Sequence, residues 1–266
     1  MALDIIVCIK QVPDPEQLSK ITLDPLKMTL NREGIPSAIN PLDRHALEEG
    51  LRIRESFSGK VTAISMGPPK AKEVLEEAFA MGVDDAVLLC DTVFAGADTL
   101  ATAYTLAGAI KKIGVFDLVI CGNETADSNT GQVAPQLAEL LNVPHVTYVK
   151  EIDLTTERSW LVRRVIEHGY LRVALELPAL IAVVKGINRP RLPSVMAIME
   201  AVGKEYKTWG CGDIEVGEDM VGLAGSPTRV TGMFELEVKR RREILEGPVE
   251  EITAKAVKRL RELGVI

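Results

Sequence analysis

Short apolar runs alternate with longer amphipathic stretches along the first two thirds of the chain. Each run has four to six residues, and most are rich in valine and isoleucine. This length and composition are typical of strands that are buried on both faces of a parallel sheet. The runs are Asp4–Ile9, Val61–Met66, Ala86–Cys90, Leu118–Cys121, His145–Val149 and Ala179–Val184.

Helix candidates lie between these runs, at Leu42–Ser56, Pro69–Met81, Asp98–Ile113 and Thr130–Leu141. Pro41 and Asp43 suit the start of the first helix, and Gly82 suits the end of the second. Repetition of strand, helix and strand predicts right-handed crossovers. The predicted fold class is therefore α/β, with a doubly wound, mostly parallel sheet.

The pattern changes after Lys150, where charged residues interrupt three hairpin-like runs at Glu151–Thr156, Trp160–Glu167 and Tyr170–Glu176. Runs of this kind predict an antiparallel addition at the edge of the sheet.

The last part of the chain has few strand candidates of its own. Two prolines in the segment 188–193 exclude a regular helix there, and helices are expected at Ser194–Val202 and Val249–Leu263. We therefore predict an α/β domain over residues 1–187, followed by a loop and an arm over residues 188–266. The leucine and methionine content of this part favours an arm that docks on another protein, and a mobile linker is the alternative.

Composition and charge narrow the possible partners. The formal net charge of -7 and the pI near 5.2 argue against a nucleic-acid partner, which calls for a basic surface. No apolar stretch reaches the length of about 18 residues that could span a bilayer, and no cationic leader is present, so we expect no membrane span and a cytoplasmic location. The four cysteines lack a CxxC pair, which favours reduced, buried thiols over a metal site.

The clearest candidate for a ligand site is the strand–loop–helix segment Leu118–Leu141. A helix start presents unpaired N–H groups and the positive end of the helix dipole, which suit a phosphate. Glycines let backbone approach a ligand closely, and Asn129 or Thr130 could cap the helix. The glycines and polar side chains concerned are Gly122, Thr125, Ser128, Thr130, Gly131 and Gln132. The pattern alone is equally compatible with a capped helix that binds nothing.

A second strand-to-helix turn has a similar character. Asp98 is the expected N-cap, and Thr99 and Thr102 share one face near the helix start. If the strands that end at Cys90 and Cys121 are neighbours, the two helix N-termini converge and a pyrophosphate could lie between them. Ordinary capping explains either helix taken alone.

Further residues could line the same crevice, because Cys8, Lys10, Asn40 and Met66 stand at carboxyl ends of strands or at a helix start. Each of them also suits an ordinary turn. No GxGxxG, P-loop or HExxH motif occurs, and no histidine accompanies an obvious nucleophile, so hydrolysis and acyl transfer lack support. The basic run 239–242 suits a solvated helix face or a partner contact.

The most specific run is Cys121-Gly122-(x4)-Asp127-(x2)-Thr130-Gly131-Gln132-Val133-(x)-Pro135-(x2)-Ala138-Glu139. Supporting elements are Cys8-Ile9-Lys10-Gln11-Val12-Pro13-Asp14, Asn40-Pro41, Ala80-Met81-Gly82-Val83-Asp84 and Asn188-Arg189-Pro190-Arg191-Leu192-Pro193-Ser194. With these elements the chain resembles, over essentially its whole length, the beta subunits of electron-transferring flavoproteins. The last element is similar to the family's partner-recognition loop.

The resemblance implies an adenine-nucleotide-binding, Rossmann-like fold and a heterodimer with an alpha subunit that carries FAD. In simple electron carriers of this family the beta site holds AMP as a structural element. In electron-bifurcating members it holds a second FAD, which takes a hydride from NADH. One electron then passes to ferredoxin or flavodoxin, and the other passes through the alpha FAD to an acyl-CoA dehydrogenase-type partner.

Two segments, Gly96–Thr102 and Thr130–Pro135, resemble the bifurcating form, whereas Glu124 and Asn129 depart from it. The resemblance therefore favours FAD, with AMP as the alternative. By position it places Cys8, Asn40 and Met66 around the adenosine and makes Leu192 the apolar anchor for the dehydrogenase. It assigns the phosphates and ribose to Asp98, Thr99, Thr102, Gly122, Thr125, Asp127, Ser128, Thr130, Gly131 and Gln132, and no residue is expected to be catalytic.

Two other hypotheses remain open at this point. The chain could be a scaffold that only orients the alpha-subunit flavin and never takes part in electron transfer. It could also be a stress-protein-like ATP binder, although that hypothesis leaves the proline-rich loop and the arm without a role.

Overall fold

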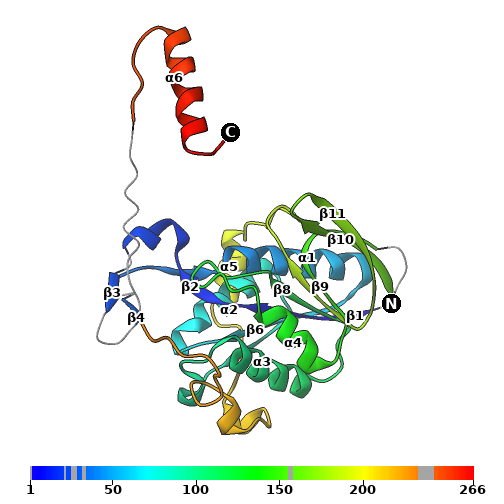
Figure 1. Ribbon diagram of the computed structural model, residues 1–266. Helices are drawn as coiled ribbons and strands as arrows, with labels where there is room; N and C mark the ends of the chain where they lie inside the picture. The colour runs from blue at the N-terminus through cyan, green and yellow to red at the C-terminus, as the bar shows by residue number, and fades with distance from the viewer. Residues whose placement is uncertain (1, 21, 25–28, 32–33, 155–157, 233–242) are drawn as a thin grey trace. The chain divides into compact units, whose positions relative to one another are not determined.

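The computed structural model of the chain describes residues 2–20, 22–24, 29–31, 34–154, 158–232 and 243–266. The chain contains two compact units, Met1–Thr231 and Gly232–Ile266. The second unit contains helix α6 (Val249–Glu262), and the first contains the sheet and the other helices (Figure 1). None of the helices in the described part of the chain is long and apolar enough to span a bilayer.

A nine-stranded sheet forms the centre of the first unit. In sheet order the strands are β11 (Gly169–Glu176), β10 (Ser159–Ile166), β9 (His145–Asp153), β12 (Ala179–Val183), β8 (Leu118–Gly122), β1 (Leu3–Ile9), β6 (Gly59–Met66), β7 (Asp85–Leu89) and β13 (Lys207–Trp209). The seven strands β9, β12, β8, β1, β6, β7 and β13 are parallel to one another. At the other edge, β10 pairs antiparallel with both β9 and β11. The predicted mostly parallel sheet with an antiparallel edge is confirmed.

Helices cover both faces of the sheet (Figure 1): α1 (Pro41–Phe57) and α2 (Lys72–Met81) lie on one face, and α3 (Thr99–Ile113) and α4 (Val133–Leu141) lie on the other. Successive side chains of a strand point to opposite faces. β1 accordingly contributes Ile5 and Val7 to the core under α1 and α2, and Ile6 and Cys8 to the core under α3 and α4. Burial on both faces is the reason that the strands appear in the sequence as unbroken apolar runs.

Local signals set most of the helix ends. Pro41 lies in the first turn of α1, where a backbone N–H would have no acceptor within the helix, so the lack of one in proline costs no hydrogen bond. Gly82 ends α2 with φ at 117°, in the left-handed region that glycine adopts without strain. Asp98 caps α3 by accepting hydrogen bonds from the backbone N–H groups of Leu100 and Ala101. These three features follow the sequence-based prediction.

The start of α4 differs from the prediction. The sequence predicted a helix from Thr130, capped by Asn129 or Thr130, but α4 begins at Val133. Asn129 (φ 47°) and Gly131 (φ 62°) have left-handed backbone, which cannot continue into a right-handed helix. Gln132 therefore becomes the N-cap, and it makes no side-chain capping hydrogen bond.

Strand β9 joins two runs that the sequence separates, His145–Val149 and Glu151–Thr156, although residues 155 and 156 lie outside the described residues. The pairing of β9 with β12 has a register irregularity between Val146 and Val149, a stretch that includes Tyr148 with φ at 57°, and Val149 pairs with both β12 and β10. The backbone N–H of Tyr148 donates to Oδ1 of Asn123 at 2.9 Å. This β-bulge is the junction between the parallel sheet and its antiparallel edge.

The boundary between the compact units lies later in the chain than the predicted division at residue 187. α5 (Val195–Ala201) packs against α2, and β13 adds a strand beside β7. At three residues, β13 is too short to show an alternating pattern in the sequence. That residues 188–266 wrap another subunit stays a prediction, and the basic run 239–242 lies outside the described residues.

Several short elements complete the fold. β2 (Gln11–Pro13) pairs with β5 (Ser37–Ile39), and β3 (Thr22–Asp24) pairs with β4 (Thr29–Asn31). Short 3₁₀ helices lie at Pro15–Lys20, Pro69–Ala71, Thr92–Phe94, Cys211–Asp213 and Glu218–Met220. The turn at Pro69–Ala71 takes up the first residues of the helix predicted from Pro69.

Candidate functional site

A cavity of about 600 Å³ opens at the carboxyl ends of β1 and β8. From β1 the chain proceeds through β6 to β7 in one direction along the sheet, whereas β8 and β12 lie on the other side of β1. Open α/β sheets bind ligands at such a switch point, because the two flanking connections leave a crevice there. Most of the predicted cofactor residues line the cavity, namely Cys8, Met66, Asp98, Thr99, Thr102, Gly122, Thr125, Ser128, Thr130, Gly131 and Gln132.

The two helix starts converge on this cavity, but not for the reason considered from the sequence. β7 and β8 are not neighbours, because β1 and β6 lie between them. The segment that connects β7 to α3 instead crosses the ends of those strands, and its residues Phe94 and Gly96 line the cavity with Met66. As a result, Oγ1 of Thr99 at the start of α3 donates to Oε1 of Gln132 at the start of α4, at 3.3 Å.

The N-terminus of α4 is the better of the two for an anion. Gln132 makes no capping bond, and Gly131, Gln132, Val133 and Ala134 all line the cavity. The first N–H groups of a helix need an acceptor from outside the helix. A ligand phosphate would satisfy them and would also gain from the helix dipole.

Asp98, at the start of α3, is committed to other contacts. Its Oδ1 accepts from the N–H groups of Leu100 and Ala101, and its Oδ2 accepts from the N–H (3.0 Å) and hydroxyl (2.7 Å) of Thr228. Burial acts to raise the pKa of Asp98, but the hydrogen bonds from Ala101, Thr228 and Leu100 lower it overall. The carboxylate thus stays ionised and fixes the segment that carries Thr228, instead of presenting a free group to a phosphate.

Two predicted residues, Asn40 and Asp127, do not line the cavity but support its wall. The amide of buried Asn40 donates to the carbonyl of Glu124 at 2.9 Å and accepts from the N–H of Ala126 at 3.0 Å. Asp127 accepts from Nζ of Lys10 at 2.8 Å, and Lys10 itself lines the cavity. Both residues therefore shape the loop between β8 and α4.

Asp43 is the main site residue that the sequence did not reveal. Its Oδ2 accepts from the N–H of Lys10 at 2.8 Å and its Oδ1 accepts from the N–H of Gly122 at 3.1 Å, so it links the ends of β1 and β8. Burial raises the pKa of Asp43 to about 7, although hydrogen bonds from Asn40, Lys10 and Gly122 act in the opposite direction. In the sequence, Asp43 looks like an ordinary acidic residue in a first helical turn.

Other wall residues come from parts of the chain that the sequence assigned elsewhere. Thr228 and Val230 line the cavity, although the sequence placed them in the arm. The thiols of Cys8 and Cys121 lie side by side in paired strands, and the hydrogen bond that the Cys121 thiol donates to Cys8, together with burial, raises the pKa of Cys121 well above its usual value. The Cys121 thiol is therefore a neutral group of the wall. Among the described residues, no cluster of three or more metal-ligating side chains occurs.

Leu192 lies apart from the cavity. It is 93% exposed, in the loop between β12 and α5.

The fold and this cavity define an α/β protein with a nucleotide-type site at the switch point of its sheet. A model of the electron transfer flavoprotein domain matches residues 27–211. The chain is 45% identical over 260 residues to the electron transfer flavoprotein subunit beta of Clostridium acetobutylicum, with 98% of each chain covered. It is 41% identical over 264 residues to the caffeyl-CoA reductase-Etf complex subunit CarD of Acetobacterium woodii, with 98% of this chain and 99% of CarD covered.

The chain is also 40% identical over 250 residues to the protein FixA of Azotobacter vinelandii, with 91% of this chain and 87% of FixA covered. This chain therefore belongs to the electron transfer flavoprotein beta-subunit family.

The raised pKa of Asp43 predicts a pH-dependent stability. Because the pKa is about 7 in the folded state and near 3.8 in the unfolded state, the stabilising effect of the bound proton is complete below pH 4 and is lost as the pH rises to 7. The unfolding free energy of the wild type, relative to that of Asp43→Asn, should fall by on the order of 4 kcal/mol across this range. Urea unfolding at a series of pH values measures the difference. Unfolding free energies of the wild type and Asp43→Asn that change with pH in parallel would contradict a raised pKa of Asp43.

Gly122 predicts a steric effect at the same contact. A Cβ on Gly122 would lie 2.3 Å from Oδ1 of Asp43 and 3.0 Å from its backbone nitrogen. Gly122→Ala should therefore destabilise the protein by about 2 kcal/mol, as overpacking of a close contact does. Gly212→Ala is the matched control, because no atom lies within 4 Å of its added Cβ. Equal unfolding midpoints for the two variants would disprove the close contact.

Proposed function

We propose that this chain is the beta subunit of a heterodimeric electron-transferring flavoprotein and that its cavity holds FAD, with NADH as the electron donor. In this proposal the beta FAD supplies the chemistry that divides a hydride's two electrons between ferredoxin or flavodoxin and, through the alpha-subunit FAD, an acyl-CoA dehydrogenase-type partner. The chain's own part is to bind and orient the cofactor. Family membership and the name of CarD, which links that relative to a caffeyl-CoA reductase complex, support the proposal.

The convergence of two helix starts on one cavity is the observation that favours FAD over AMP. α4 brings unpaired N–H groups, while α3 brings the hydroxyls of Thr99 and Thr102 to the same wall. A monophosphate would need one of these two sets of donors. A pyrophosphate, which has two phosphates within one ligand, can use both.

The donors that suit the phosphates are mostly neutral. Among the described wall residues Lys10 is the cation, and its ammonium already pairs with Asp127 at 2.8 Å. Backbone N–H groups and hydroxyls therefore carry the recognition, which resembles dinucleotide binding at a helix N-terminus more than binding by a cluster of basic side chains.

The cofactor content of the purified heterodimer tests this proposal. Acid extraction followed by chromatography should release close to two flavins per heterodimer and no AMP, and the complex should oxidise NADH. One flavin together with one AMP would instead establish the simple carrier, in which the beta site is structural. A heterodimer with ATP in this site would support the stress-protein-like alternative.

The hydroxyls at the start of α3 provide a sharper prediction. The double variant Thr99→Val and Thr102→Val keeps the side-chain shape and removes two donors, so the affinity for the second flavin should fall by at least about tenfold. Titration of flavin-depleted heterodimer with FAD measures it. Thr208→Val, at an exposed position in β13, is the matched control. If replacing Thr99 and Thr102 with phenylalanine left electron transfer intact, the scaffold hypothesis would be preferred.

A further inference from the structure

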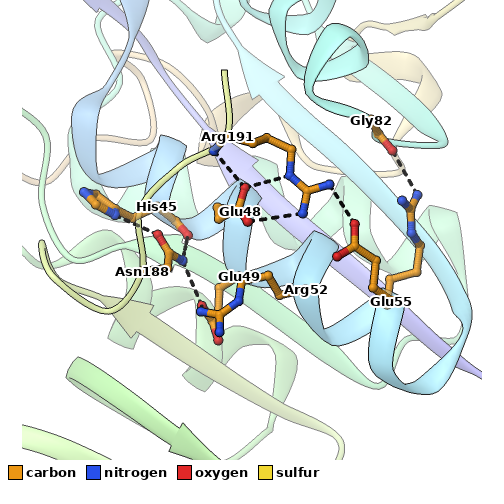
Figure 2. Close-up of polar contacts among 9 residues, drawn as sticks. His45, Glu48, Glu49, Arg52, Glu55, Gly82, Asn188 and Arg191 are labelled. Atoms are coloured by element: carbon orange, nitrogen blue, oxygen red, sulfur yellow. Dashed lines mark hydrogen bonds and ion pairs between the residues drawn. The ribbon is translucent and has the colours of Figure 1, made fainter. Parts of the chain in front are cut away.

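The loop that carries Leu192 is fixed at two points before any partner binds. Figure 2 shows that Asn188 and Arg191, which precede Leu192, both reach the same helix, α1. The residues they contact, at positions 45, 48, 49 and 55, follow helical spacing and lie along one side of α1.

Arg191 makes the stronger attachment. Its Nε and Nη2 donate to the two carboxylate oxygens of Glu48, at 2.8 and 3.1 Å, and its Nη1 donates to Glu55 at 2.7 Å. The backbone N–H of Arg191 also donates to Glu48, at 3.0 Å. Glu48 therefore holds both the side chain and the main chain of Arg191, and the single ammonium of lysine cannot reproduce the forked side-chain contacts.

Burial makes this attachment costly to break. The side chain of Glu48 is 7% exposed, whereas that of Glu55 is 50% exposed. A buried carboxylate that loses its cation is strongly destabilised, and removing both partners relieves that penalty. Glu48 is therefore the essential acceptor, and Glu55 is an accessory one.

Asn188 makes the second attachment. Its Nδ2 donates to the carbonyl of His45 at 2.9 Å and to Glu49 at 2.8 Å. Because this fixes Nδ2 as the donor, Oδ1 is the acceptor, and Nδ1 of His45 carries the hydrogen in the 2.8 Å contact between them. Two residues that flank Arg189 and Pro190 are thus held on one rigid helix.

These contacts hold the residues that directly precede an exposed apolar side chain. Leu192 is 93% exposed, and it lies directly between Arg191 and Pro193. An exposed leucine binds an apolar pocket more tightly if its backbone is ordered beforehand, because less conformational entropy is lost on binding.

We propose that Arg191 is a positioning residue for partner docking. Its hydrogen bonds to Glu48 and Glu55 hold the loop so that Leu192 is presented in the geometry in which it binds the partner. This inference rests on the proposed function, since it requires that the loop docks on a dehydrogenase-type partner. The partner is a protein with an apolar pocket that accepts one leucine side chain followed by a proline. Arg191 itself need not touch that partner.

Hydrogen exchange of the heterodimer tests the fixing of the loop without any partner. In Arg191→Gln, amides of the peptide that covers Arg191 and Leu192 should exchange at least about tenfold faster than in the wild type. Leu192→Ala is the matched control and should leave this exchange unchanged, because it removes no contact to α1. Unchanged exchange in Arg191→Gln would overturn the inference whatever the protein's function.

Electron transfer to a purified acyl-CoA dehydrogenase, used as the probe, tests docking. Arg191→Gln should raise the KM for the dehydrogenase by about tenfold with kcat within about twofold, because only the ordering of the loop is lost. The KM of Arg191→Lys should be close to that of Arg191→Gln, and Glu55→Gln should raise the KM by less. An unchanged KM together with faster exchange would show that the contacts of Arg191 with Glu48 and Glu55 order the loop but do not assist docking, which would overturn the positioning role.

The double variant Arg191→Gln with Glu48→Gln guards against a failure to fold. It leaves no unpaired buried charge, so it should unfold at a higher urea concentration than Arg191→Gln alone while retaining the raised KM. A normal KM in the double variant would overturn the positioning role. Failure of the wild-type heterodimer to reduce any acyl-CoA dehydrogenase would count against the proposed function. The exchange experiment would still decide whether Arg191 orders the loop.

Discussion

The carboxylate of Asp43 joins the ends of two parallel strands just beyond their last paired residues, Cys8 and Cys121. At this point the connections from β1 and β8 diverge, so the N–H groups of Lys10 and Gly122 have no hydrogen-bond acceptor in the facing strand of this pair. Buried N–H groups without an acceptor are costly. Asp43 accepts from both, and so permits the strands to separate and leave a crevice without unsatisfied backbone. The rest of the site depends on this contact.

The approach of Asp43 to Gly122 also explains the chemistry at this strand end. A side chain there would occupy the position of the carboxylate, which makes glycine the residue that fits. The loop that follows is held by Asn40 and Asp127 from behind, so its hydroxyls and the free helix start of α4 face the cavity. The result is a wall whose donors are mostly neutral, an arrangement that suits a phosphate.

Helix α1 serves two regions of the surface. Its first turn carries Asp43 and shapes the crevice, and its later turns carry Glu48, Glu49 and Glu55, which hold the loop around Leu192. The cavity and the loop that carries the exposed leucine are therefore both attached to one packed helix. Glu48 and Glu49 on this side of α1 are buried, and both accept hydrogen bonds from the protein's own loop.

Patterns of local range were visible in the sequence. The apolar runs placed the strands, Gly82 and Asp98 marked helix ends, and the motif around Gly122 and Gln132 indicated the cavity wall. The β-bulge at Tyr148 and the late start of α4 were missed, because each depends on a backbone conformation imposed by distant contacts or by left-handed residues. The three-residue β13 was missed because its partner, β7, lies far away in the sequence.

The sequence by itself determined the fold class, since hydrophobic periodicity and helix capping act over a few neighbouring residues. The family, and the predicted cofactor residues that line the cavity, followed from the resemblance of its motifs. Only the tertiary structure decided how those residues act. It used Asp98 to fix Thr228, placed Asn40 and Asp127 behind the wall, and gave Asp43 and Arg191 their partners. Each of these contacts joins residues far apart in the chain, and no local pattern specifies which pairs will meet.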